Sequence, residues 1–226
     1  EALSDHTGAE VKHIDPRQTI PTDEMERLQK ALLDHGMLLF RGHALSPAEL
    51  TAFGRQWGPL MPHVQKKFHV PGYPELVYNI NVDRTGEFDD GAARRGVHET
   101  TKENWHSDQS YDALPSRATI VSAVELPREG GSTLFKNTYK AYETMPQDLT
   151  ARIEGKLGVF GYVAGRKHPA FAHLTKNAAA ADFVTHPLAR TVPMTGRKAI
   201  YVNAICCSGV DGMTDEDGAA LLDEVY

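Results

Sequence analysis

The segment NWHSDQSY at residues 104–111 places a histidine and an aspartate two positions apart, at His106 and Asp108. On an extended backbone, side chains two residues apart point to the same face. An imidazole and a carboxylate side by side can supply two neighbouring ligands to one metal ion, and the 2-His-1-carboxylate triad of non-heme Fe(II) oxygenases needs such a pair together with one distant histidine. An isolated H-x-D is more often a solvated strand end or a hydrogen-bonded pair, so the rest of the chain decides between these interpretations.

Length and composition are those of a soluble globular domain. The chain has 226 residues, of which 41% are hydrophobic and 24% charged, and its net charge is −6. We expect no nucleic-acid partner, because the charge is negative and the basic residues form no stripe. We also expect no membrane span, because no apolar run approaches the roughly 18 residues that a span requires.

The cysteines and the N-terminus point to a cytoplasmic protein. Cys206 and Cys207 are the only cysteines, and two adjacent cysteines make neither a disulfide framework nor the paired spacing of a structural zinc site. The chain does not begin with a basic segment followed by an apolar one, so no secretory signal is predicted. The sequence is compatible with both a monomer and a homo-oligomer.

Four helices are predicted from capping residues and apolar periodicity. Thr22 is expected to cap a helix that Gly36 ends, and the capping box that starts at Ser46 begins a second helix. A third helix is expected over residues 139–154 with a break at Pro146, and Thr214 should cap the last.

The remaining pattern is typical of many short strands. Expected strands are the segments 8–11, 37–40, 76–82, 118–124, 132–135 and 157–163, and a hairpin formed by 185–192 and 198–203. The polar segment 83–103 lacks periodicity, and such a long connection is predicted to be either a substrate lid or a disordered loop, with the lid favoured. We therefore predict a mainly β fold with flanking helices, a jelly roll.

Several segments together resemble one family. They are HGMLLFRG (35–42), FGRQWGPL (53–60), WHSDQSY (105–111), ELPREGGSTLF (125–135), HPLART (186–191) and TGRKAIYVN (195–203). In this order and spacing they resemble the taurine dioxygenase / phenoxyacetate dioxygenase (TauD/TfdA-like) family, from near residue 8 to the end of the chain. The resemblance implies a double-stranded β-helix, the jelly-roll form of Fe(II)- and 2-oxoglutarate-dependent oxygenases.

The resemblance also implies roles for individual residues. His106 and Asp108 would be the first two Fe(II) ligands, and the Thr133 hydroxyl would help to hold a carboxylate of 2-oxoglutarate. In this family a third ligand, a histidine, and an arginine for the far carboxylate come from a C-terminal stretch. This sequence has no histidine after residue 203 and no arginine after Arg197, and His186 lies in a segment that does not match the ligand. We therefore expect one domain over residues 1–226, truncated at its C-terminus and with little or no activity as written.

The implied substrate is a small organic acid, a carboxylate or a sulfonate, hydroxylated with O2 while 2-oxoglutarate becomes succinate and CO2. His63 would contact the acid group, and Tyr162 and Cys206 would line the substrate pocket. Each has an ordinary alternative: a solvated loop histidine for His63, core packing for the other two, and a plain strand residue for Thr133. Two other functions stay open, namely a catalytically degenerate family member that acts as a binding protein, and a zinc hydrolase that uses the same H-x-D.

Overall fold

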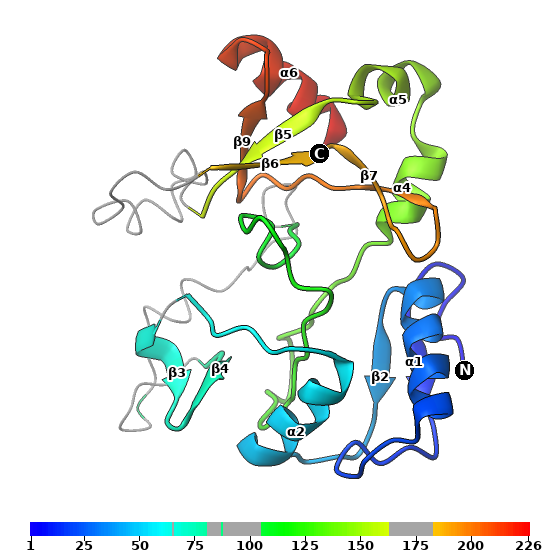
Figure 1. The fold of residues 1–226 in the computed structure, drawn as a ribbon, viewed down its shortest axis with the longest axis vertical. Helices are drawn as coiled ribbons and strands as arrows, with labels where there is room; N and C mark the ends of the chain where they lie inside the picture. The colour runs from blue at the N-terminus through cyan, green and yellow to red at the C-terminus, as the bar shows by residue number, and fades with distance from the viewer. Residues whose placement is uncertain (65, 81–86, 88–104, 163–182) are drawn as a thin grey trace. The chain divides into compact units, whose positions relative to one another are not determined.

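The computed structural model describes residues 1–64, 66–80, 87, 105–162 and 183–226 (Figure 1). The chain divides into two compact units. The first unit comprises Glu1–Asn79 and Ile120–Asn137, and the second comprises Ile80–Thr119 and Thr138–Tyr226. No helix in these described ranges is both long and apolar enough to cross a bilayer.

The first unit is built on a small parallel sheet and two helices. Its elements are β1 (Ala9–Val11), α1 (Thr22–His35), β2 (Leu38–Phe40), α2 (Pro47–Trp57), the short 3₁₀ helix η1 (Lys66–Phe68), β3 (His69–Val70) and β4 (Tyr73–Val77). β1 pairs in parallel with β2, and β3 pairs antiparallel with β4. α1 connects the two parallel strands, as a parallel pair requires a crossover.

The core of the first unit forms where the apolar faces of α1 and α2 meet. Met25 and Leu28 from α1 and Phe53 from α2 are buried in one cluster with Ile20. The Phe53 ring packs edge-on against Phe40, with ring centroids 5.3 Å apart. These contacts explain why the apolar positions of both helices repeat at helical spacing.

The caps of these helices agree with the sequence at α2 and differ at α1. At α2 the predicted capping box is present: the Glu49 backbone N–H donates to Ser46 Oγ (3.3 Å), and the Ser46 N–H donates to Glu49 Oε2 (2.8 Å). The predicted Thr22 cap is wrong, because Thr22 is already helical and Pro21, which has no capping side chain, precedes it. A hydroxyl in the first helical position cannot reach back to the unpaired N–H groups. Gly36 ends α1 with φ 73°, as predicted.

The second unit is built on a three-stranded antiparallel sheet and a hairpin. Its elements are α4 (Thr138–Thr144), α5 (Gln147–Ile153), β5 (Leu157–Phe160), β6 (Val184–Pro187), β7 (Ala189–Thr191), β8 (Lys198–Ile200), β9 (Cys207–Val210) and α6 (Asp215–Val225). The sheet order is β6-β5-β9, and β7 pairs with β8. The break between α4 and α5 falls at Pro146, and Thr214 caps α6, so both predictions are confirmed.

The core of the second unit lies between this sheet and the helices α5 and α6 (Figure 1). Ile153, Phe160 and Leu188 are fully buried there. Gly158 lies in the same core, where an added Cβ would come within 2.8 Å of Leu188 Cδ2 and of Phe160 Cε2. A side chain at this position would therefore force the buried Leu188 and Phe160 side chains to shift.

Several strand predictions are wrong. Residues 118–124 and 132–135 contain no strand, and the strand expected over residues 76–82 ends at Val77. Val121 and Val124 are 80% and 85% exposed. A branched run forms a strand only where a partner strand accepts its hydrogen bonds, and none does so in the described part of the chain. The expected hairpin is β7–β8, whereas residues 184–187 join the three-stranded sheet as β6.

Three predictions reach into residues that are not described. Residues 81–82 of the strand expected over 76–82 lie outside the described ranges. The strand expected over residues 157–163 is β5 as far as Phe160, and residue 163 lies outside the described ranges. The proposed lid at 83–103 also lies outside them except for Glu87. The described strands form separate two- and three-stranded sheets, so by themselves they do not outline the predicted jelly roll.

Candidate metal site

The side chains of His106 and Asp108 converge at the start of a turn in the second unit. Residues 105–107 have no regular structure, and the turn runs from Asp108 to Tyr111. His106 Nε2 lies 3.2 Å from Asp108 Oδ1, and the two side chains are 47% and 49% exposed. The juxtaposition expected from the H-x-D spacing is present, and both side chains are about half exposed.

The spacing of these two atoms fits a divalent metal ion. Ligand bonds of about 2.1 Å place two donors in neighbouring octahedral positions about 3 Å apart. The observed 3.2 Å matches that value, although a hydrogen-bonded ion pair has a similar distance. No cluster of three His, Cys, Asp or Glu side chains able to hold a metal occurs among the described residues. The pair therefore fits two positions of a metal site, and a third protein ligand is not among the residues described.

The turn itself has an uncommon backbone. Gln109, between Asp108 and Ser110, has φ 53°, in the left-handed region that few residues other than glycine adopt. The Asp112 N–H closes the turn by donating to the Gln109 carbonyl (2.9 Å). The Ser116 hydroxyl also donates to the Gln109 side-chain oxygen. Local hydrogen bonds thus stabilise the conformation that brings the histidine and the aspartate together.

Two buried polar side chains of the second unit also hold this turn. Asn203 Nδ2 donates to Ser110 Oγ (3.0 Å), and Ser110 is fully buried. His186 Nε2 donates to the Asp112 carbonyl (2.9 Å), which assigns the ring proton to Nε2. Ser110 and Asn203 were not predicted to be near the site, although both lie within segments that carry the family resemblance.

Tyr162 and Cys206, the two predicted pocket residues, both lie next to this turn. The Tyr162 ring packs edge-on against Tyr111, with centroids 4.9 Å apart. Cys206 is buried, and burial raises the pKa of its thiol, while a hydrogen bond with Ser110 lowers it and the nearby Asp108 carboxylate raises it. Burial also raises the pKa of Tyr111, and the charges of Asp112 and Asp108 add to the shift. The structure therefore groups the histidine–aspartate pair, two tyrosines and a thiol in one region.

Thr133 and His63, the other two predicted site residues, both belong to the first unit. Thr133 is exposed and lies in the irregular segment 120–137. The His63 N–H donates to the Pro74 carbonyl (3.1 Å), and the His63 carbonyl accepts from His69 Nε2 (2.7 Å). His63 thus lies beside the β3–β4 hairpin, and both roles stay predictions.

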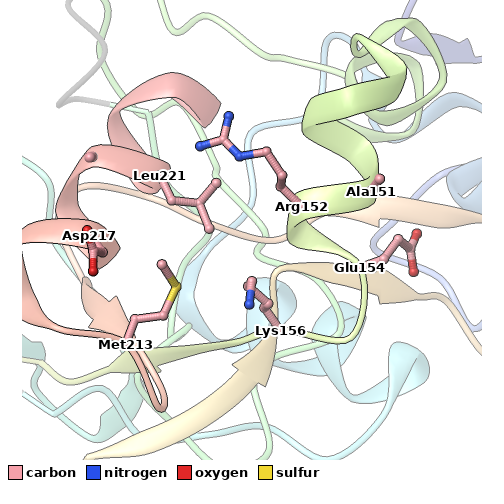
Figure 2. Close-up of a pocket in the computed structure, with 8 residues that line it drawn as sticks. Ala151, Arg152, Glu154, Lys156, Met213, Asp217 and Leu221 are labelled. Carbon is pink, nitrogen blue, oxygen red and sulfur yellow. The ribbon is translucent and has the colours of Figure 1, made fainter.

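A separate hollow of about 540 Å³ opens between α5 and α6. In Figure 2 the Arg152 side chain extends from α5 toward α6, and Met213 and Leu221 point toward the space between the helices. Arg152 is already engaged in a two-point ion pair with Glu224 (2.6 and 2.7 Å). The hollow is lined by none of the predicted site residues, and it is an ordinary groove between packed helices.

Comparison with known proteins identifies the family. The family model described as "Taurine catabolism dioxygenase TauD, TfdA family" matches residues 1–226. The chain is 31% identical to the alpha-ketoglutarate-dependent 2,4-dichlorophenoxyacetate dioxygenase of Cupriavidus pinatubonensis, over 96% of this chain and 77% of that protein. It is 30% identical to pentalenolactone F synthase of Streptomyces avermitilis, over 88% of this chain and 68% of that protein.

More distant relatives and solved structures agree with this result. The alpha-ketoglutarate-dependent sulfonate dioxygenase of Saccharomyces cerevisiae is 26% identical over 89% of this chain and 48% of its own length. The crystal structure of a taurine dioxygenase from Burkholderia xenovorans superposes with a TM-score of 0.75 and 26% identity, covering 100% of this chain and 70% of that one. The fold is therefore that of the taurine dioxygenases, and the chain belongs to the TauD/TfdA family of dioxygenases.

Proposed function

We propose that the protein is an Fe(II)- and 2-oxoglutarate-dependent dioxygenase that hydroxylates a small organic acid, a carboxylate or a sulfonate, and releases succinate and CO2. The observation that carries this proposal is the 3.2 Å approach of His106 Nε2 to Asp108 Oδ1 in a chain of this family. Relatives named as dioxygenases of 2,4-dichlorophenoxyacetate and of sulfonates support an acidic substrate.

The ligand pair would bind the iron through two neighbouring positions. A bound Fe(II) would supply the activation of O2, coupled to oxidative decarboxylation of 2-oxoglutarate. His106 would use its neutral imidazole and Asp108 its carboxylate, and the remaining positions stay open for the co-substrate and O2. In the first unit, the Thr133 hydroxyl would donate to a carboxylate of 2-oxoglutarate.

The substrate would be held by polar and apolar groups together. His63 would donate a hydrogen bond to its acid group, and Tyr162 and Cys206 would line the apolar part of the pocket. The packing of Tyr162 on Tyr111 supports a wall that excludes water from the reacting C–H bond.

The same proposal covers the organisation of the protein. Residues 1–226 would belong to one dioxygenase domain whose strands form a double-stranded β-helix. The protein would act in the cytoplasm, and its self-association can be tested separately. One alternative is a degenerate member that binds small acids without oxidising them. A zinc hydrolase remains the third reading of the same pair.

The test is succinate release by the full-length protein with Fe(II), 2-oxoglutarate and a panel of sulfonates and phenoxyalkanoates. Asp108→Ala should abolish release, because it removes one of the two proposed iron ligands. Ser132→Ala, an exposed change in the first unit, is the control and should leave release unchanged.

Metal identity separates the alternatives. Under anaerobic conditions, Fe(II) with 2-oxoglutarate should give a visible charge-transfer band in the wild type and none in Asp108→Ala. A protein that binds the acids yet releases no succinate with any of them would be the degenerate member. Hydrolytic activity with zinc and no such band would favour the hydrolase.

A further inference from the structure

We infer that Asn203 is a positioning residue, whose carboxamide fixes the turn that carries His106 and Asp108. The inference rests on the proposed function, because it assigns to Asn203 an effect on the binding of a divalent metal. Asn203 lies just beyond β8, in the connection to β9, and is only 3% exposed. Its carboxamide therefore has to find its partners within the protein.

The connection to β9 fixes the orientation of the Asn203 side chain. Asn203 Oδ1 accepts from the Cys206 backbone N–H (2.8 Å), and the Asn203 carbonyl accepts from the Cys207 N–H (2.9 Å). A backbone N–H can only donate, so the oxygen of the carboxamide must face Cys206 and its NH2 group must face the other way. Asn203 is thus anchored to the start of β9, with two donors aimed at the turn.

The turn receives one of these donors at Ser110. Asn203 Nδ2 lies 3.0 Å from Ser110 Oγ, and both residues are buried. Ser110 is two positions from Asp108, with Gln109 and its left-handed φ of 53° between them. A conformation of this kind persists only when the surroundings hold it. The Asn203–Ser110 bond supplies such a restraint directly beside the aspartate.

A second restraint acts at the far end of the turn. His186 Nε2 donates to the Asp112 carbonyl (2.9 Å), and the His186 ring is itself packed edge-on against Phe160 and Tyr201. The Asn203 bond is the nearer of the two to Asp108. Outer groups that orient metal ligands commonly contribute 10- to 100-fold in metal affinity. Loss of the Asn203 carboxamide should therefore weaken metal binding even though Asn203 contacts no metal.

The experiment compares Asn203→Ala, Ser110→Ala and the double variant with wild type in the full-length protein. Ser110→Ala removes only a hydroxyl, so it keeps the test valid if Asn203→Ala folds poorly. The controls are Ser208→Ala, whose exposed hydroxyl donates to the Val159 carbonyl in the same sheet, and Asn137→Ala, whose carboxamide donates to the His6 carbonyl. The probe is Mn(II), with free Mn(II) measured by electron paramagnetic resonance.

Both single variants should bind Mn(II) about 10-fold or more weakly than wild type. The loss of affinity in the double variant should be smaller than the product of the two single losses, because both single changes remove the Asn203–Ser110 bond. Hydrogen exchange of the peptide that covers residues 105–112 should accelerate in both variants and stay unchanged in Ser208→Ala and Asn137→Ala. Hydrogen exchange thus reports on the stability of the turn in the absence of any metal.

The outcomes separate the inference from the proposed function. If wild type binds no Mn(II), the proposed function fails and the inference fails with it. If wild type binds Mn(II) and both variants bind it equally well with unchanged hydrogen exchange at 105–112, the inference alone is overturned. A loss of affinity in the two controls of the same size as in the variants would also overturn it.

Discussion

His186 is the one histidine of the β6 strand, and its contacts show why a residue type alone does not make a ligand. Its Nε2 donates to the Asp112 carbonyl, and its ring packs between Phe160 and Tyr201. The side chain is 6% exposed. A ring held by these contacts stabilises the turn through Asp112, and the exclusion of His186 from the proposed ligand pair stays a prediction.

Burial should make both cysteines unreactive in the folded protein. Cys206 and Cys207 are each 6% exposed, and burial raises the pKa of Cys207 to about 11 from an ordinary value of 9.0. The reactive species is the thiolate, so at pH 8 an alkylating reagent should label neither thiol until denaturant is added. Mass spectrometry of the alkylated protein measures this. Rapid labelling of either cysteine in the native protein would contradict the buried placement.

The same shift predicts how stability depends on pH. The unfolded chain releases the Cys207 proton near pH 9, whereas the folded protein holds it until about pH 11. The stabilising contribution is therefore complete below pH 9 and is lost as pH rises from 9 to 11. Cys207→Ala should flatten the fall in the free energy of unfolding across this window, as measured by urea denaturation. An unchanged slope in that variant would show that other groups cause the alkaline loss.

Helix caps can be compared directly between two elements of the first unit. Ser46→Ala should lower the free energy of unfolding by about 1 kcal/mol, because it removes the cap of α2 and leaves a backbone N–H unpaired. Thr22→Ala should change it by less than about 0.5 kcal/mol, because Thr22 is the first helical residue of α1 and not its cap.

Urea denaturation of the two variants measures this difference under identical conditions. The pair forms a matched comparison, since each change removes one hydroxyl at the start of a helix. An equal decrease in the free energy of unfolding in the two variants would show that Thr22 does cap α1.

Strand prediction failed at this same scale for a definable reason. Residues 118–124 carry the branched side chains of a strand, yet Val121 and Val124 are 80% and 85% exposed and pair with no strand in the described ranges. β5, in contrast, alternates partly and fully buried residues and pairs on both sides, with β6 and β9. Local sequence expresses the preference for extended chain, and the partner strand decides whether a sheet forms.

At the scale of the whole molecule, the proposal of one domain predicts one cooperative unfolding transition. Phe53→Ala should remove the ring that packs between Phe40 and Trp57 in the first unit and cost about 3–5 kcal/mol. If the two units fold together, this change lowers the temperature of a single transition. Differential scanning calorimetry of the full-length protein measures it, with Phe160→Ala as the matching change in the second unit. Two transitions, each moved by only one of the variants, would show that the units unfold independently.

The family and the approach of His106 to Asp108 could be predicted from the sequence by itself. The family followed from six short segments in order, and the H-x-D spacing placed the two side chains together, as their 3.2 Å separation shows, although a turn that starts at Asp108 brings them together and not a strand. The capping box of α2 and the break at Pro146 are equally local and were predicted correctly. Features of this kind depend only on neighbouring residues, so they can be predicted from the local sequence.

Only the tertiary structure decided what surrounds the pair. Ser110 and Asn203 are 93 positions apart in the chain, and no local sequence pattern predicts the hydrogen bond between their side chains. The same is true of His186 and Asp112, which are 74 positions apart. Such contacts depend on which strands pair and which side chains the core excludes from water. The proposed ligand pair can therefore be predicted from its spacing, whereas the residues that hold its turn in place emerge only when distant segments pack together.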